Sequence, residues 1–301
     1  MLMIISASRR TDIPAFYSDW FFNRINEGFV LVRNPVNMHQ VSKISLSPDA
    51  ADCIVFWTKN PGPMLKRLPE LNQYHFYFQF TLNSYDTSIE TNVPEKRQLI
   101  ETFRKLSGMI GRERVIWRYD PVLLTRKFNA EYHAKWFEYL AEKLCNYTDR
   151  CVISFMDLYK KTERNLRGIG LLPMDNGIMN ELAGRISAVS SKVGIRVESC
   201  SEAIDLERYG IRHGKCIDDA LISKITGKRI KPVKDSNQRP NCGCVRSVDI
   251  GAYNTCRHHC LYCYANFSRE SVKRNVCLHH DGSPLLVGEL GEKDIVTVRL
   301  D

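Results

Sequence analysis

The chain has 301 residues, of which 44% are hydrophobic and 26% are charged, and its formal net charge is +9. This composition is typical of a folded globular protein and excludes a disordered or collagen-like chain. No apolar stretch approaches the roughly 20 residues that cross a bilayer. The short apolar run at the start is followed at once by Arg9, Arg10 and Asp12, which is not a signal-peptide layout. We therefore expect a cytoplasmic protein without a membrane partner.

Short apolar runs rich in β-branched and aromatic residues recur along the chain. They predict buried parallel strands at residues 3–7, 53–57, 76–80, 115–119, 151–155 and 195–198, and residues 248–253, just before three closely spaced cysteines, add one more. Helical spacing and length predict helices at residues 94–110, 130–146 and 175–193. Residues 29–33 and 41–46 flank the segment NPVNMH and predict a β-hairpin or two short strands outside the main sheet.

Strands that alternate with helices predict βαβ units and a parallel sheet. The number of predicted strands is close to that of a (β/α) barrel, complete or partial, and an open doubly wound sheet is the alternative. The basic stretch at residues 223–240 is the one plausible boundary. We expect a barrel body over residues 1–222, and a basic connector with a Cys-rich unit that completes the barrel over residues 223–301.

Polar and charged residues follow the predicted strands at their carboxyl ends, where the active sites of parallel barrels lie. We expect the basic ones to bind anionic groups and the others to orient a substrate. Loop solvation and helix capping are the simpler alternative, because Asp, Asn and Thr also cap helices. The candidate catalytic residues are Arg9, Arg10, Asp12, Lys59, Asn83, Arg118 and Asp120, with Asp157 as a further acid that can offset their charge.

The chain has 11 cysteines, an odd number that favours metal or redox chemistry over disulfides in a cytoplasmic protein. Cys256, Cys260 and Cys263, the first cysteine group, have the spacing C-x3-C-x2-C. Three thiolates at this spacing can bind three irons of a [4Fe–4S] cluster and leave the fourth iron open. A structural zinc site is the alternative, and its fourth ligand would come from His258, His259, Cys277, His279 or His280.

A second cysteine group consists of Cys200, Cys216, Cys242 and Cys244. Four thiolates complete a closed site, which suits either a second [4Fe–4S] cluster or structural zinc. Four ordinary buried thiols are the simplest alternative.

The first cysteine group, with Tyr262 before its last member, resembles the C-x3-C-x-aromatic-C signature of the radical SAM superfamily. The run CLYCYAN is also similar to the motif region of spore photoproduct lyase-type repair enzymes. A longer likeness runs from SASRRTDIP through FWTKNP, FQFTLN and WRYDP to DIGAYNTC, and it is to bacterial proteins with a domain of unknown function.

The superfamily resemblance implies that S-adenosylmethionine (SAM) binds the open iron and yields a 5′-deoxyadenosyl radical, with flavodoxin or ferredoxin as electron donor. It implies that Tyr262 lies near the adenine, and it makes Asn254 and Asn266 candidate cofactor-binding residues. In the superfamily the motif usually follows the first barrel strand, whereas here it lies near the C-terminus. The resemblance therefore implies a circularly permuted barrel, with residues 248–253 beside residues 3–7. The Gly-Gly-Glu stretch that often holds the SAM amino group is not found in the sequence.

The charge of +9 and the basic residues at 223–240 permit a small-molecule anion or a nucleic-acid-derived substrate, and a solvated, lysine-rich surface is the simpler alternative. The alternative function is a metal-stabilised nucleic-acid-binding protein without radical chemistry.

Overall fold

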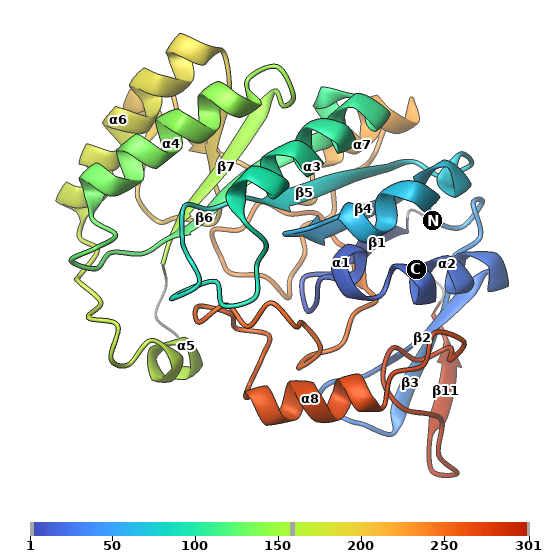
Figure 1. The fold of residues 1–301 in the computed structure, drawn as a ribbon. Helices are drawn as coiled ribbons and strands as arrows, with labels where there is room; N and C mark the ends of the chain where they lie inside the picture. Colours follow the sequence, from blue (N-terminus) through green and yellow to red (C-terminus); the bar gives the residue numbers. More distant parts are fainter. Residues whose placement is uncertain (1–2, 157–159, 300–301) are drawn as a thin grey trace.

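The computed structural model describes residues 3–156 and 160–299. Its centre is an eight-stranded parallel sheet within a mixed α/β fold (Figure 1). From one edge to the other, the strands are β10 (Val248–Asp249), β1 (Ile4–Ala7), β4 (Cys53–Thr58), β5 (Phe76–Thr81), β6 (Val115–Val122), β7 (Arg150–Phe155), β8 (Arg196–Ser199) and β9 (Arg212–His213). The sequence predicts the parallel sheet and seven of its strands, and β9 is the additional one.

The strands form at continuous apolar runs because both faces of this sheet are buried. In β4, Phe56 packs in the core beneath the helices, while Val55 belongs to a second cluster on the opposite face. The pairing of β10 with β1 is parallel, which confirms that the strand before the cysteine motif lies beside the N-terminal strand. β10 is shorter than predicted, since Asp249 Oδ1 accepts a hydrogen bond from Gly251 N at 3.0 Å and the chain turns there.

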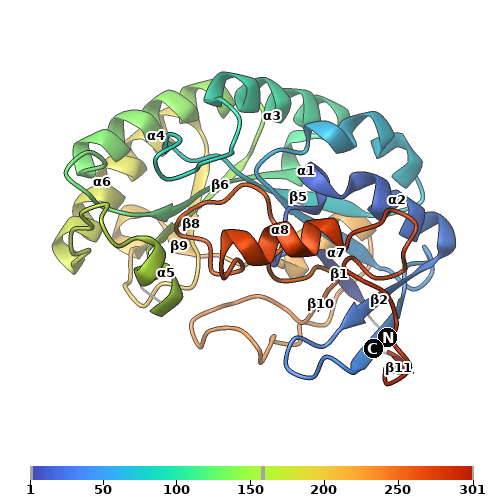
Figure 2. The same cartoon turned by 60° about the horizontal axis from the view of Figure 1, so that its bottom comes forward.

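Helices cover the outer face of the sheet. The three long helices that the sequence predicts are present as α3 (Lys96–Ile110), α4 (Ala130–Leu144) and α6 (Asn176–Val193). They form an arch over the sheet in Figure 2. The side chain of Asp175 caps α6 by accepting from Ile178 N. The layer continues with α1 (Ile13–Phe16), α2 (Ser18–Glu27) and the 3₁₀ helix η1 (Gly62–Leu71).

The inner face of the sheet is covered by residues 214–247, here called the inner-face segment, which includes α7 (Asp219–Thr226). Figure 2 shows this pale orange chain on the opposite side of the sheet from the helical arch. Ile217, Ile222 and Ile230 pack with Val55 and Tyr77 of the sheet. The inner face is therefore filled by side chains, as in a packed barrel interior.

A small second sheet has the strand order β11-β3-β2. Its strands β2 (Phe29–Arg33) and β3 (Gln40–Ser45) are antiparallel, which confirms the hairpin outside the main sheet. β11 (Ile295–Val298) pairs in parallel with β3 and is not among the predicted strands. The remaining elements are η2 (Arg112–Arg114), α5 (Lys160–Asn165), η3 (Glu207–Tyr209) and α8 (Arg269–Cys277).

The main sheet ends at β10 on one side and at β9 on the other, and no strand pairing joins these two edges within residues 3–156 and 160–299. The sheet is thus not closed by hydrogen bonds into a complete barrel. The part of the chain after residue 222 contributes β10 to the main sheet and β11 to the small one. None of the helices described by the structure is both long enough and apolar enough to cross a membrane.

Candidate functional site

The cysteine loop, residues 250–268, runs from β10 to α8 and carries the first cysteine group. It starts at the carboxyl end of β10, beside the carboxyl end of β1. Asp249 joins the two strands, because its carboxylate accepts hydrogen bonds from Ser6 Oγ at 2.9 Å, Ser8 Oγ at 2.6 Å and Arg9 N at 2.8 Å. The start of the chain and the cysteine loop therefore form one edge of the sheet, as the permuted arrangement requires.

The thiols of the first cysteine group lie in a polar backbone environment. Cys260 is buried, whereas Cys256 and Cys263 are partly exposed. Backbone N–H groups partly offset the effect of burial on the pKa values, that of His258 at Cys256 and those of Ala265 and Asn266 at Cys263. Burial raises the pKa of Cys260 to about 12 and also raises those of Cys256 and Cys263. Without a metal, the three groups are therefore thiols, and metal binding would release their protons.

Asn254 and Asn266 brace the loop. Asn254 has a left-handed backbone with φ of 58°, and its Oδ1 accepts from Phe267 N at 2.5 Å. Asn266 Nδ2 donates to Cys256 O at 2.8 Å. Both side chains thus bond to the loop backbone close to the cysteines, and Asn266 Oδ1 is a buried acceptor with no hydrogen-bond partner among the described residues.

Asp12 fastens the N-terminal part of the chain to the cysteine loop. Its Oδ1 caps α1 by accepting from Ala15 N at 3.0 Å. Its Oδ2 accepts from Lys59 N at 2.6 Å and lies 2.9 Å from His258 Nε2. Asp12 therefore does more than cap α1. Its contact with His258 also positions the cysteine loop.

Two of the histidines that could complete a zinc site at the first cysteine group, His258 and His279, are engaged elsewhere. His258 contacts Asp12 through Nε2, and its Nδ1 lies 3.4 Å from Asn92 O. His279 uses Nδ1 toward Leu286 O at 2.8 Å and Nε2 toward Asp281 at 3.0 Å. Cys277 is exposed on α8.

A buried carboxylate that the sequence analysis missed, Glu90, lies beside the loop. It is 1% exposed, and it pairs with Lys59 Nζ and with Lys96 Nζ, each at 2.7 Å. Tyr262 donates its O–H to the same carboxylate. Burial alone would raise the pKa of Glu90, but Lys59 and Lys96 outweigh it and lower the pKa to about 2. Glu90 is thus a carboxylate that fixes the aromatic residue of the cysteine motif.

Asn83 belongs to the same network. Its Nδ2 donates to Asp120 O at 2.8 Å and to Tyr262 Oη at 3.1 Å. Asn83 Oδ1 is buried and has no hydrogen-bond partner among the residues that the structure describes. Because a buried unpaired acceptor is costly, this atom is a natural place for a donor from a bound molecule.

Arg118 and Asp120, predicted as substrate residues, are paired with each other. Arg118 is 5% exposed, and its Nε donates to Asp120 Oδ1 at 3.0 Å. Its Nη1 donates to Cys216 Sγ at 2.7 Å, so it reaches the second cysteine group. The sequence predicts that Arg118 and Lys59 bind an anionic substrate. Because both are already paired with carboxylates of the protein, such a substrate would have to compete with these ion pairs.

Arg9 and Arg10 lie at the carboxyl end of β1. Arg9 stacks 5.4 Å from the Trp57 ring centre, and its Nη1 lies 3.5 Å from Asp235. Arg9 Nη2 is buried without a hydrogen-bond partner within the described chain. Arg10 donates to Gly251 O at 3.4 Å. The other strand-end acid, Asp157, lies outside the described residues.

The fold brings the four sulfur atoms of the second cysteine group close to one another. Cys200 Sγ and Cys216 Sγ are 3.3 Å apart, and Cys244 contacts both Cys216 and Cys242 through hydrogen bonds. The bond from Cys200 lowers the pKa of Cys216 well below its usual range, and the bond from Cys244 lowers that of Cys242 to about 6. Across the described chain, no three His, Cys, Asp or Glu side chains are already spaced around a common point as metal ligands.

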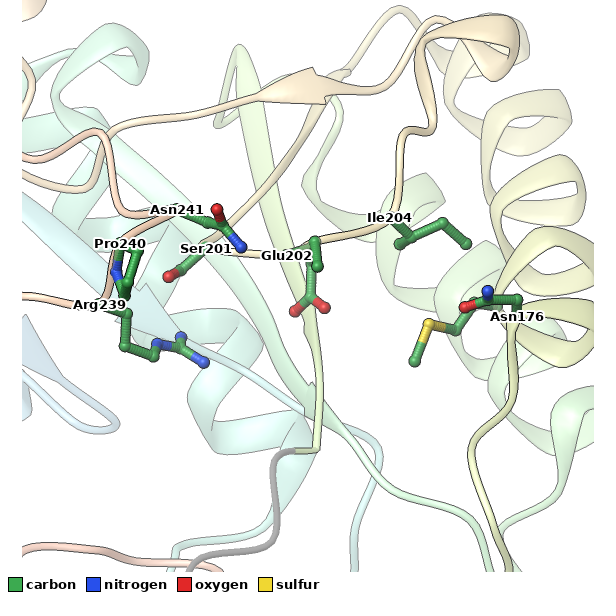
Figure 3. Close-up of a pocket in the computed structure, with 9 residues that line it drawn as sticks. Asn176, Ser201, Glu202, Ile204, Arg239, Pro240 and Asn241 are labelled. Atoms are coloured by element: carbon green, nitrogen blue, oxygen red, sulfur yellow. The ribbon is translucent and has the colours of Figure 1, made fainter.

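A cavity of about 330 Å³ opens beside the second cysteine group. Its walls come from the residues after β8, the N-terminal end of α6 and the chain just before Cys242. Figure 3 shows Glu202 and Arg239 extending into this space from different walls. The lining residues are Asn176, Met179, Ser201, Glu202, Ala203, Ile204, Arg239, Pro240 and Asn241.

The fold and the site define an α/β protein whose parallel sheet carries two groups of cysteines, one of them at its carboxyl edge. The chain belongs to the family described as Domain of unknown function (DUF1848), whose model matches residues 4–265. Both cysteine groups fall inside this match. The family therefore includes the site but brings no activity with it.

Other comparisons add little. No curated protein matches the chain. A solved structure of a candidate alpha-L-fucosidase from Bacteroides thetaiotaomicron is similar over 61% of this chain and 76% of that chain, with 12% identity and a TM-score of 0.26. A likeness this low carries no argument about fold or function.

Proposed function

We propose that the protein is an iron–sulfur enzyme of the radical SAM type, with a [4Fe–4S] cluster on Cys256, Cys260 and Cys263. The observation that carries the proposal is the cysteine loop itself. In this loop Cys263 N donates to Cys260 O at 3.1 Å, and backbone N–H groups beside Cys256 and Cys263 favour their thiolate forms. N–H groups that interact with ligand sulfurs tune the potential of iron–sulfur clusters.

The contacts of His258 also favour three cluster ligands over a zinc site completed by that histidine. Both nitrogens of His258 are directed at Asp12 and Asn92 rather than at the cysteines. A tetrahedral structural zinc site would need a fourth protein ligand. Cys256 and Cys263 are partly exposed, which supports access to one side of the group.

A cluster with SAM on its open iron supplies one-electron cleavage of the sulfonium bond and a 5′-deoxyadenosyl radical. The chain's own residues would bind and orient the cosubstrate. Asn83 Oδ1 and Asn266 Oδ1 are the buried acceptors that a bound amino group or base could satisfy. Tyr262, held by Glu90, would present its ring to the adenine.

The parallel pairing of β10 with β1 supports a circularly permuted, partial (β/α) barrel as the framework. In this arrangement the motif strand is the last main-sheet strand in the sequence, but it is an edge strand next to the N-terminal one. The inner-face segment fills the interior, so substrate would approach from the carboxyl edge.

The substrate we propose is anionic or derived from a nucleic acid. Arg9 Nη2 is a buried donor without a partner within the described residues, at the edge that carries the cysteine loop. Six basic side chains with high exposure could guide a polyanion, namely Lys224, Lys228, Arg229, Lys231, Lys234 and Arg239. A flavodoxin or ferredoxin would supply the electron.

Iron and acid-labile sulfide in anaerobically purified protein test the proposal. We expect about four irons and four sulfides per chain in the wild type, and their loss in Cys260→Ala. Cys277→Ala is the matched control, because Cys277 is exposed on α8 and lies outside both groups. A wild type that contains zinc alone would overturn the proposal.

The second candidate is a metal-stabilised nucleic-acid-binding protein, favoured by the six exposed basic side chains named above. It predicts tight binding of single-stranded DNA whose affinity falls steeply with salt, by a protein that holds metal but forms no 5′-deoxyadenosine from SAM. Fluorescence anisotropy with a labelled oligonucleotide, at several salt concentrations, distinguishes this function from the first.

A further inference from the structure

The second cysteine group lies between the sheet and the inner-face segment. Cys200 follows β8 and Cys216 follows β9, whereas Cys242 and Cys244 precede β10. All four belong to the apolar cluster on the inner face of the sheet or pack against it. The group thus joins three separate stretches of chain at one buried place.

The four sulfurs form a continuous chain of contacts. Cys200 contacts Cys216, Cys216 contacts Cys244, and Cys244 contacts Cys242. The Cys200–Cys216 distance is 3.3 Å, much longer than the roughly 2.05 Å of a disulfide bond. The sulfurs are therefore separate atoms packed against one another.

The distance between the ligand sulfurs differs between the two kinds of metal centre that four thiolates can hold. Around one tetrahedral Zn²⁺ with bonds of about 2.3 Å, ligand sulfurs are about 3.8 Å apart. Movement of a few tenths of an ångström would bring the Cys200–Cys216 pair to that value. A [4Fe–4S] cubane has each thiolate on a different iron, so its ligands lie much farther apart, and the buried inner face would have to open.

We propose that Cys200, Cys216, Cys242 and Cys244 bind a single Zn²⁺ ion in a closed, structural site. The site shares no ligand with the first cysteine group, and the proposal does not require a cluster there. Four thiolates and one Zn²⁺ carry a net charge of about −2, which is costly to bury unless cations lie nearby.

Two arginines supply that positive charge. Arg118 Nη1 donates to Cys216 Sγ at 2.7 Å. The Arg118 guanidinium carbon lies 5.2 Å from the centre of the Trp57 ring. Arg9 stacks on the same Trp57 at 5.4 Å and lies close enough to Cys216 and Cys244 for an electrostatic interaction. Each arginine also has a carboxylate partner, Asp120 for Arg118 and Asp235 for Arg9.

The ion would anchor the strand that carries the cysteine loop. β10 has only 2 residues and few hydrogen bonds of its own, and Cys244 precedes it by a short link. On the other side, Tyr77 Oη and Gln79 Nε2 donate to Cys216 O at 2.6 and 2.8 Å, which ties the group to β5. A metal at this place would hold β10 against the rest of the sheet.

The test uses the full chain with Cys256, Cys260 and Cys263 all changed to Ala, so that only the second group can bind metal. We expect one zinc and no iron per chain after anaerobic purification. Replacement of zinc by Co²⁺ should give thiolate-to-cobalt charge-transfer bands and the intense visible bands of tetrahedral Co²⁺.

Adding Cys242→Ser to this triple variant should abolish the bands, whereas adding Cys145→Ser should leave them, because Cys145 lies outside the group. If Cys242→Ser does not fold, the spectrum of the triple variant still decides the question. Iron with sulfide in the triple variant, or no metal at all, would overturn the zinc site. If the first cysteine group holds no cluster, the wild type and the triple variant would instead have equal iron contents.

Discussion

Asp12 and His258 are 246 positions apart in the chain, yet Asp12 Oδ2 lies 2.9 Å from His258 Nε2. The contact joins the loop after β1 to the middle of the cysteine motif. Because Asp12 also caps α1 and accepts from Lys59 N, one carboxylate sets the position of three segments. The cysteine loop therefore depends on residues at the other end of the sequence.

Asp12→Ala should destabilise the protein by about 1–3 kcal/mol, since a buried hydrogen-bonded carboxylate and a helix cap are lost together. It should also lower the iron retained by the first cysteine group. Asp19→Ala is the control, because Asp19 is 70% exposed and its pair with Arg67 lies on the surface. Chemical denaturation and iron analysis check both effects, and an Asp12→Ala protein with wild-type values of both would contradict the role.

Glu90→Gln should cost about 3 kcal/mol of folding free energy, because the half-buried charges of Lys59 and Lys96 would lose their buried partner. Glu101→Gln should cost less than about 0.5 kcal/mol, since its pair with Arg97 is exposed. Adding Lys96→Met to Glu90→Gln should restore part of the loss. Equal unfolding free energies for the Glu90 and Glu101 variants would refute the buried ion-pair assignment.

The tight approach of β10 to β1 can be tested at Gly251. A Cβ there would lie 2.0 Å from Ser8 Oγ and 2.6 Å from Ser8 Cβ, so Gly251→Ala should push the strands apart and cost about 1–3 kcal/mol. Gly108→Ala in α3 is the control. Its Cβ would meet nothing within 4 Å, and the change should stabilise the helix by up to about 1 kcal/mol. Thermal unfolding of both variants should show shifts of opposite sign.

His133 gives the protein a predictable pH dependence. It is buried, its Nδ1 lies 2.8 Å from Tyr119 Oη, and burial lowers its pKa from 6.5 to about 4. Between these values the unfolded state binds more protons than the folded state. The His133 contribution is therefore complete above pH 6.5 and is lost as the pH falls toward 4, by about 3 kcal/mol in all.

His133→Gln removes this titration. The unfolding free energy of the wild type should fall more steeply than that of the variant between pH 6.5 and pH 4. Parallel pH profiles for the two proteins would show that His133 does not titrate as described.

Much of the sheet could be predicted, since strands such as β4 and β5 are continuous apolar runs buried on both faces. β9 and β10 have 2 residues each, too few for a pattern, and β10 was found only because it precedes the cysteine motif. β11 is exposed along its whole length, so its residues Ile295 and Val298 carry no burial signal.

The site was predicted less completely because its contacts cross between strands. The spacing of Cys256, Cys260 and Cys263 is local and can be read directly. The contact of Arg118 with Cys216 joins residues 98 positions apart, and neither local sequence contains a pattern that predicts it. Glu90 stands in a loop among other polar residues, and only packing shows that it is buried between two lysines.

The central proposal is tested most directly by the formation of 5′-deoxyadenosine when anaerobically purified protein is reduced with dithionite and mixed with SAM. We predict 5′-deoxyadenosine from the wild type and from Cys277→Ala, and none from Cys260→Ala. A wild-type protein that holds iron and sulfide but forms no 5′-deoxyadenosine under these conditions would contradict the radical SAM assignment.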